Sequence, residues 1–162
     1  MTTLLAIDPG LRGCGVALFE DDCLVRCAYV KNTQREARGP KAWRAMGEAV
    51  LKWLDLSQVD LLVLEVPQVY VRGKGDPADL IELAGVDGAI AALVDGRKTE
   101  GYLPKEWKGS VPKDVYQARF EKTLTASEKV MIQQSSAPSL RHNVTDAVAI
   151  GKWWIKKNRS VI

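Results

Sequence analysis

Three carboxylates stand where apolar segments give way to polar residues. Asp8 ends the segment LLAID, Glu65 ends LLVLE, and Asp146 lies near the start of the apolar segment NVTDAVAIG. An ionised carboxylate is costly to bury without a positive partner. Three together repel one another by roughly 1 kcal/mol per pair even at water-like screening. Oxygen ligands of this kind suit a divalent cation, magnesium above all, so the three acids predict a metal site that cleaves phosphodiesters.

Local structural roles compete with this interpretation for two of the acids. Asp8 can cap the turn to Gly10, and Asp146 can stabilise the first turn of a helix through the helix dipole. Glu65 has no such role within a β-strand, and its position favours the metal site for the whole set.

The elements that must position these acids follow from hydrophobic periodicity. LLAID, CGVALF and CLVRCAYV predict a three-stranded antiparallel meander, and VDLLVLEV predicts a strand buried on both faces. TEGYLP predicts a short fifth strand. Helical spacing predicts a first helix through Ala42 and Leu54 and a second from Pro77 to about Val94. Further helices are predicted over Val115–Leu124, from Ser127, and from near Asn143. We expect one mixed α/β domain over residues 1–162.

Composition limits the class of protein. The 162 residues are 46% hydrophobic and 27% charged, with a net charge of +3. These values are typical of a globular protein, so any basic surface that matters must be local. No apolar run approaches the roughly 18 residues of a membrane span, and we expect a cytoplasmic protein without a membrane partner. Cys14, Cys23 and Cys27 lack nearby histidines, which argues against zinc and against a disulfide framework and favours buried free thiols.

The order of strands and helices, with acids on the first strand, the fourth strand and the last helix, resembles the RNase H-like nuclease superfamily. Within it the chain is most similar to the RuvC family of Holliday junction resolvases. The segments that carry the resemblance span nearly the whole length in the family's order: AIDPGLRGCGVALF, VLEVPQVY, PKEWKGSVPKDVYQARF and HNVTDAVAIGKWW.

This resemblance implies an RNase H-like fold, an α/β architecture with a five-stranded mixed sheet flanked by helices. It also implies a crossover junction endodeoxyribonuclease that nicks two opposing strands of a four-way DNA junction symmetrically. Two Mg²⁺ ions would act in each site, with Mn²⁺ as a substitute and no nucleotide cofactor. The protein would act as a homodimer, with the helix near residues 78–94 close to the interface.

Residue roles follow from the same resemblance. Asp8 would bridge the two ions, and Glu65 and Asp146 would each bind one. The family carries an acid or a histidine three positions before its last acid, where this chain has Asn143 and, one residue earlier, His142. We expect His142 to bind metal or position a water, although a surface histidine at a helix start is the alternative.

Basic and aromatic residues would contact DNA. Lys105, Lys108 and Lys113 match the family's lysine segment, and Lys108 is also expected to be catalytic by offsetting charge at the scissile phosphate. Tyr70 resembles a residue that stacks on unpaired bases, and Arg72 and Lys74 would contact phosphates. For the lysines the alternative is a solvated loop.

Three other functions remain open on the sequence. The first is an RNase H- or YqgF-like nuclease acting on RNA or RNA–DNA hybrid. The second is a non-catalytic junction-binding module. The third, an actin-like ATPase, needs two such domains and more than 162 residues.

Overall fold

The computed structural model describes residues 2–68, 76–94 and 98–159. Tyr70, Arg72 and Lys74, for which DNA contacts were expected, lie outside the described residues. None of the helices in these ranges combines the length and the apolar character that a bilayer span requires.

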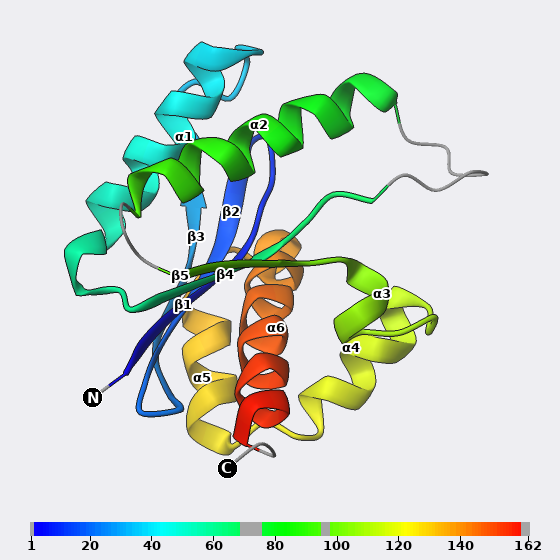
Figure 1. The fold of residues 1–162 in the computed structure, drawn as a ribbon. Coiled ribbons are helices and arrows are strands. Elements are labelled where there is room, and N and C mark those ends of the chain that lie inside the picture. The colour runs from blue at the N-terminus through cyan, green and yellow to red at the C-terminus, as the bar shows by residue number, and fades with distance from the viewer. Residues whose placement is uncertain (1, 69–75, 95–97, 160–162) are drawn as a thin grey trace.

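The centre of the molecule is a five-stranded sheet of order β3-β2-β1-β4-β5 (Figure 1). Its first three strands form the expected antiparallel meander, whereas β4 and β5 run parallel to β1. The predicted mixed sheet is therefore confirmed. The strands are β1 (Thr3–Asp8), β2 (Gly13–Glu20), β3 (Cys23–Lys31), β4 (Leu61–Glu65) and β5 (Lys98–Tyr102).

Helices cover both faces of this sheet. Figure 1 shows α1 and α2 on one face, α5 and α6 on the other, and α3 and α4 beside α6. The helices are α1 (Pro40–Trp53), α2 (Pro77–Leu93), α3 (Pro104–Trp107), α4 (Lys113–Glu121), α5 (Ala126–Gln134) and α6 (Arg141–Arg159), with 3₁₀ turns at Leu56–Gln58 and Pro138–Leu140.

Two hydrophobic cores result, one on each face. Alternate β1 residues point to opposite sides, so Leu5 and Ile7 pack with α1 and α2 while Leu4 and Ala6 pack with α6. This double coverage explains why β1 and β4 have nearly continuous apolar sequences.

Helix α6 lies very close to the sheet because glycines face it. A Cβ on Gly15 of β2 would come within 2.0 Å of the Asn143 carbonyl oxygen, and one on Gly151 of α6 within 2.3 Å of the Phe19 ring. Both contacts are closer than any side chain allows, so these glycines let α6 seat its N-terminal turns beside the end of β1.

Three helix boundaries differ from the sequence predictions. Helix α4 begins at Lys113, directly after Pro112, instead of at Val115. Helix α5 begins at Ala126, where Thr125 accepts a hydrogen bond from the Glu128 N–H as N-cap. Helix α6 begins at Arg141, so Asp146 lies beyond the first turn and its interpretation as a helix cap is wrong.

The cysteines are free, but only two are buried. Cys14 and Cys27 lie in the cores, while Cys23 is exposed at the start of the edge strand β3. The expectation of buried thiols was therefore wrong for Cys23, because the outer strand of a sheet has an uncovered face.

Candidate metal and phosphate site

Asp8 and Glu65 end two neighbouring parallel strands. Ile7 pairs with Leu64 across β1 and β4, so the next residue of each strand carries its carboxylate at the same edge of the sheet. The carboxyl ends of parallel strands are where ligand sites form in α/β sheets.

Asp146 reaches this edge from α6. Its side chain is only 3% exposed, and α6 packs against β1 and β2 through the glycine contacts described above. The structure therefore brings together the end of two strands and the second turn of a helix, elements far apart in the sequence.

Burial and crowding perturb these acids. Burial, and then the charges of Glu65 and Asp146, hold the pKa of Asp8 well above its usual range. Burial also raises the pKa of Glu65, although the Lys108 ammonium partly offsets this effect. The three carboxylates thus interact electrostatically, as their predicted convergence requires.

Two lysines pair with two of the acids. Lys108 Nζ lies 3.2 Å from Glu65 Oε2, and both side chains are largely buried at 15% and 17% exposure. Lys113 Nζ lies 3.0 Å from Asp146 Oδ2 and is half exposed. Asp8 has neither an ion pair nor a side-chain hydrogen bond within the described ranges. As they stand, no three acidic, histidine or cysteine side chains of the described residues form a metal-binding group.

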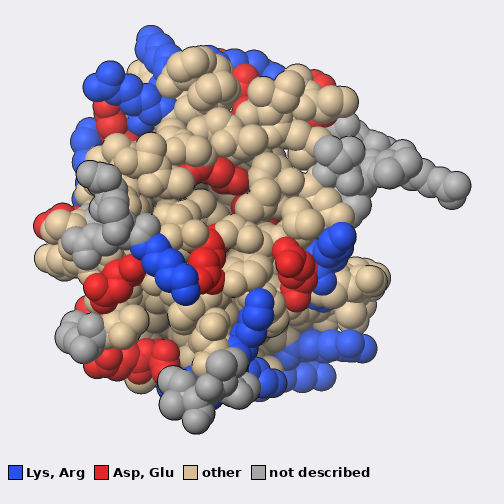
Figure 2. Space-filling model, viewed as in Figure 1, with Lys and Arg blue, Asp and Glu red and all other residues tan. Residues whose placement is uncertain are grey.

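A basic cavity adjoins the Glu65–Lys108 pair. Its volume is about 570 Å³, and its lining includes Gln68, Lys105, Lys108, Ser110 and Lys113. No acidic side chain is found among the described residues that line it. Figure 2 shows Lys and Arg side chains gathered over the region of α3 and α4, with acidic side chains near the centre of the same face. Such a cavity can accept a phosphate from solution.

His142 lies in the first turn of α6, four residues before Asp146, and is exposed. Residues four apart share a helix face, but the imidazole makes no hydrogen bond or ion pair with any described residue. Asn143 instead lines a separate cavity beside Gly10 and Arg12. His142 as the fourth ligand therefore stays a prediction.

Two side chains near the site were missed from the sequence. Gln117 Nε2 donates a hydrogen bond to Asp146 Oδ1 at 3.2 Å, and Asp87 of α2 is close enough to Glu65 for its charge to be felt. The acid between Val86 and Gly88, in the apolar second half of the helix, was the available signal for Asp87. No sequence signal pointed to Gln117, whose role depends on how α4 packs against α6.

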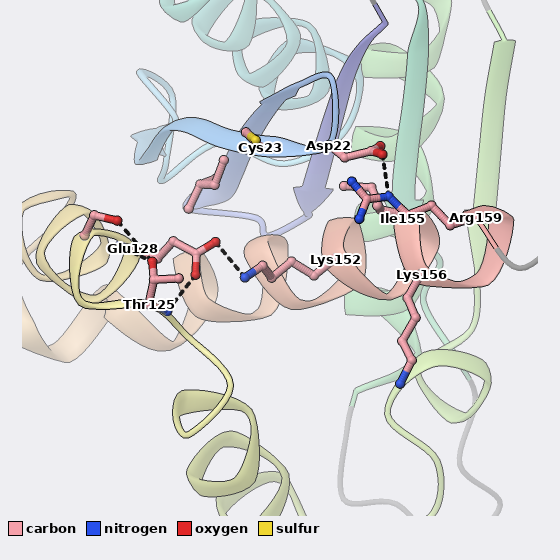
Figure 3. A pocket seen from close by; sticks show the side chains of 10 residues that line it. Asp22, Cys23, Thr125, Glu128, Lys152, Ile155, Lys156 and Arg159 are labelled. Atoms are coloured by element: carbon pink, nitrogen blue, oxygen red, sulfur yellow. Dashed lines mark hydrogen bonds and ion pairs between the residues drawn. The ribbon is translucent and has the colours of Figure 1, made fainter.

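A larger cavity elsewhere is less suited to chemistry. Its volume is about 610 Å³, and it lies between the β2–β3 turn, α5 and the second half of α6 (Figure 3). Arg159 Nε bonds Asp22 Oδ2 at 2.6 Å and Lys152 Nζ bonds Glu128 Oε1 at 2.6 Å, so its main charges are already paired. This cavity is a gap between packed elements, and we assign no activity to it.

Comparison with known proteins finds similar folds. RuvC of T. thermophilus in complex with a Holliday junction substrate superimposes with a TM-score of 0.64 at 17% identity, covering 99% of this chain and 96% of that one. A second structure of Thermus thermophilus RuvC gives a TM-score of 0.62. The yeast mitochondrial Holliday junction resolvase Ydc2 gives 0.63 at 10% identity, covering 96% of this chain and 79% of that one.

No protein-family model and no curated protein sequence matches the chain. At these low identities the likeness concerns the fold, and the expected RuvC-type, RNase H-like architecture is confirmed.

Proposed function

We propose that this chain is a metal-dependent endonuclease that resolves four-way DNA junctions by paired symmetric nicks. The observation that carries the proposal is the convergence of Asp8, Glu65 and Asp146 at one sheet edge. The fold around them is shared with RuvC and Ydc2, whose structures are described as Holliday junction proteins.

The residues fit a hard divalent cation. All three acids offer carboxylate oxygens, the ligands that Mg²⁺ prefers and Mn²⁺ accepts. Asp8 is partly buried and forms no ion pair with a described residue, while the other two acids hold lysines that a cation can replace. A pair of such ions, when bound, would supply Lewis acidity and a hydroxide nucleophile for an in-line displacement.

The chain's own groups would position the substrate. Asp8, Glu65 and Asp146 would hold the cations, with His142 as a further ligand. Lys108 and Lys113 would turn from these acids to the scissile phosphate and offset its developing charge. Lys105, on the wall of the same basic cavity, would bind a neighbouring phosphate. Tyr70, Arg72 and Lys74 complete the proposed DNA contacts.

A homodimer would provide two identical active sites, one for each of the two DNA strands that are nicked. An apolar groove of about 720 Å³ runs between α1 and α2, with Trp43, Leu51 and Leu93 in its lining. On α2, Ile81 leaves 67% of its surface exposed. Exposed apolar surface of this kind marks interaction sites, and a twofold contact through it would pair two copies of the chain.

The test is cleavage of end-labelled DNA in Mg²⁺, using a four-way junction, a linear duplex of the same sequence, a Y-fork and an RNA–DNA hybrid. We expect paired nicks confined to the junction and no cleavage by the Asp8→Asn and Asp146→Asn variants, which should still bind the junction. Cleavage of the hybrid alone would assign the chain to an RNA-directed nuclease. Junction binding without cleavage by the wild type would assign it to a non-catalytic module.

A further inference from the structure

Asp87 is a buried carboxylate without a partner. It lies in the middle of α2, between the fully buried Val86 and the exposed Gly88. Both of its carboxylate oxygens are closed off from solvent, and neither receives a hydrogen bond from a described residue.

Asp87 lies near Glu65, at the edge of the sheet that carries the acids of the site. Burial first, and then the Glu65 carboxylate, raise the pKa of Asp87 to about 8. Burial is the main cause that raises the pKa of Cys14 on β2, and its hydrogen bond to Gly10 partly offsets this effect. The charges of Asp8 and Asp87 then raise the pKa further. Asp87 therefore approaches the site from the α2 side of the sheet, opposite to Asp146 on α6.

No described donor can satisfy it. Lys108 is bound to Glu65 and Lys113 to Asp146. The Cys14 thiol is directed to the Gly10 carbonyl oxygen, 3.9 Å away. The two lysines thus pair with two of the four acids and leave Asp8 and Asp87 without an ion pair among the described residues, and a divalent cation nearby would favour the ionised form of both.

The energetics argue against a purely structural role. A buried polar group without a hydrogen bond destabilises the fold, and a charged one does so more. An apolar residue at this position would extend the core of Val86 and Ile90 without that cost. A buried unpaired acid is a common sign of function in a cleft.

We propose that Asp87 is a fourth acid of the metal site, which accepts hydrogen bonds from the water shell of the cation held at Glu65. An indirect contact fits the preference of Mg²⁺ for keeping several of its waters. Asp87 is thus a positioning residue for the cation, and the inference rests on the proposed function.

The experiment measures Mn²⁺ binding to the full chain, without DNA, by calorimetry and by the electron paramagnetic resonance signal of free Mn²⁺. Outer partners of metal ligands typically change affinity 10–100-fold, so we expect Asp87→Asn to weaken binding about tenfold. Asp79→Asn is the matched control, because Asp79 lies on the same helix but pairs with Arg38 at the surface; its affinity should equal that of the wild type.

Thermal melting in EDTA gives an independent readout. At a pH above its raised pKa of about 8, Asp87 is an unpaired buried charge, so Asp87→Asn should raise the Tm of the metal-free protein at that pH, and Mg²⁺ should stabilise this variant less than the wild type. Asp87→Leu should behave in the same way, which covers the case in which the buried amide hinders folding.

The outcomes separate the inference from the proposed function. Unchanged Mn²⁺ affinity in both Asp87 variants, with binding lost in Asp8→Asn, would overturn the role of Asp87 and leave the nuclease intact. Weakened affinity in a protein that cleaves no junction would support Asp87 and overturn the resolvase. A wild type that binds no Mn²⁺ would overturn both.

Discussion

At the scale of single residues, the site is an acidic cluster held together by lysines. Each ion pair joins a side chain from the α3–α4 region to an acid on β4 or α6. Because Glu65 and Lys108 are both largely buried, removing one partner leaves a charge that water reaches poorly. The ammonium groups of Lys108 and Lys113, which pair with these acids in the metal-free site, are the groups proposed to contact the scissile phosphate.

Lys108→Ala should therefore slow the chemical step more than it weakens binding. Loss of one electrostatic stabiliser of the transition state typically costs about 10²–10³-fold in rate. We expect at least a tenfold fall in the single-turnover rate on a four-way junction, with the Kd changed less than threefold.

Lys105→Ala is the matched control for this variant. Lys105 lines the same cavity but forms no ion pair with a described residue, so its loss should weaken binding with little effect on the single-turnover rate. Equal rates for Lys108→Ala and the wild type would remove Lys108 from the catalytic groups.

The sequence predicts those site residues that stand out within their own segment, and it does not predict those that only tertiary packing brings to the site. Asp8, Glu65 and Asp146 interrupt apolar segments, and the structure brings them to one edge as expected. Gln117 and Asp87 reach the same place only because α4 and α2 pack there. That packing is a tertiary property, and the local hydrophobic periodicity of the sequence does not predict it.

At the scale of elements, α6 decides whether the acids meet. Its sequence made a helix with Asp146 near the start predictable, but not its first residue or its close seating on β2. Gly15 pairs with Asp8 in the sheet register and faces the Asn143 backbone. Strand glycines often mark such close backbone approach.

Gly15→Ala should push the start of α6 away from β1. We expect the variant to lose about 1–3 kcal/mol of unfolding free energy, as overpacked cores do, and to lose most of its junction cleavage because Asp146 moves with the helix. Denaturant unfolding and cleavage assays measure the two effects.

Gly151→Ala provides the comparison. Gly151 lies further along α6, five residues past Asp146, and a Cβ there would collide with the ring of Phe19 on β2. A similar loss of stability with a smaller loss of cleavage is expected. Full activity of Gly15→Ala would show that the site does not depend on this contact.

A second element contact links α5 to α6 at the cavity in Figure 3. Glu128 accepts a hydrogen bond from the Thr125 N–H at 2.8 Å and pairs with Lys152. Burial alone would raise the pKa of Glu128, but the bonds from Lys152 and Thr125 outweigh burial and lower it. A carboxyl with a lowered folded pKa contributes stability above its unfolded pKa and loses it as the pH falls through the folded value.

Glu128→Gln should thus lower the unfolding free energy at pH 7 by about 1–3 kcal/mol. The difference from the wild type should shrink as the pH falls below 4.5, the ordinary pKa of a glutamate side chain. Thermal melts at pH 7 and pH 3 measure it, with the exposed Glu121→Gln as control. A difference that stays constant with pH would assign the effect to packing rather than to charge.

At the scale of the whole molecule, the two faces of the sheet differ in the side chains that they carry. The α6 face carries Asp146, whereas the α1–α2 face carries the apolar groove and the exposed Ile81. Acidic and basic side chains are interspersed over the face seen in Figure 2, in keeping with a net charge of only +3. DNA binding would therefore depend on local lysines, and pairing of two copies would bring two such local sites together on one junction.

The dimer is testable through Ile81. This side chain shares a face of α2 with Gly85 and Gly88, which line the groove. A charge there would be desolvated in a twofold contact and would face its own copy across the axis. We expect the wild type to sediment at twice the mass of one chain at micromolar concentration and Ile81→Glu to sediment as a monomer. The variant should cut junctions at single strands in place of paired nicks. Val130→Glu, at another exposed apolar position on α5, should remain dimeric. A monomeric wild type that still makes paired nicks would contradict the dimer.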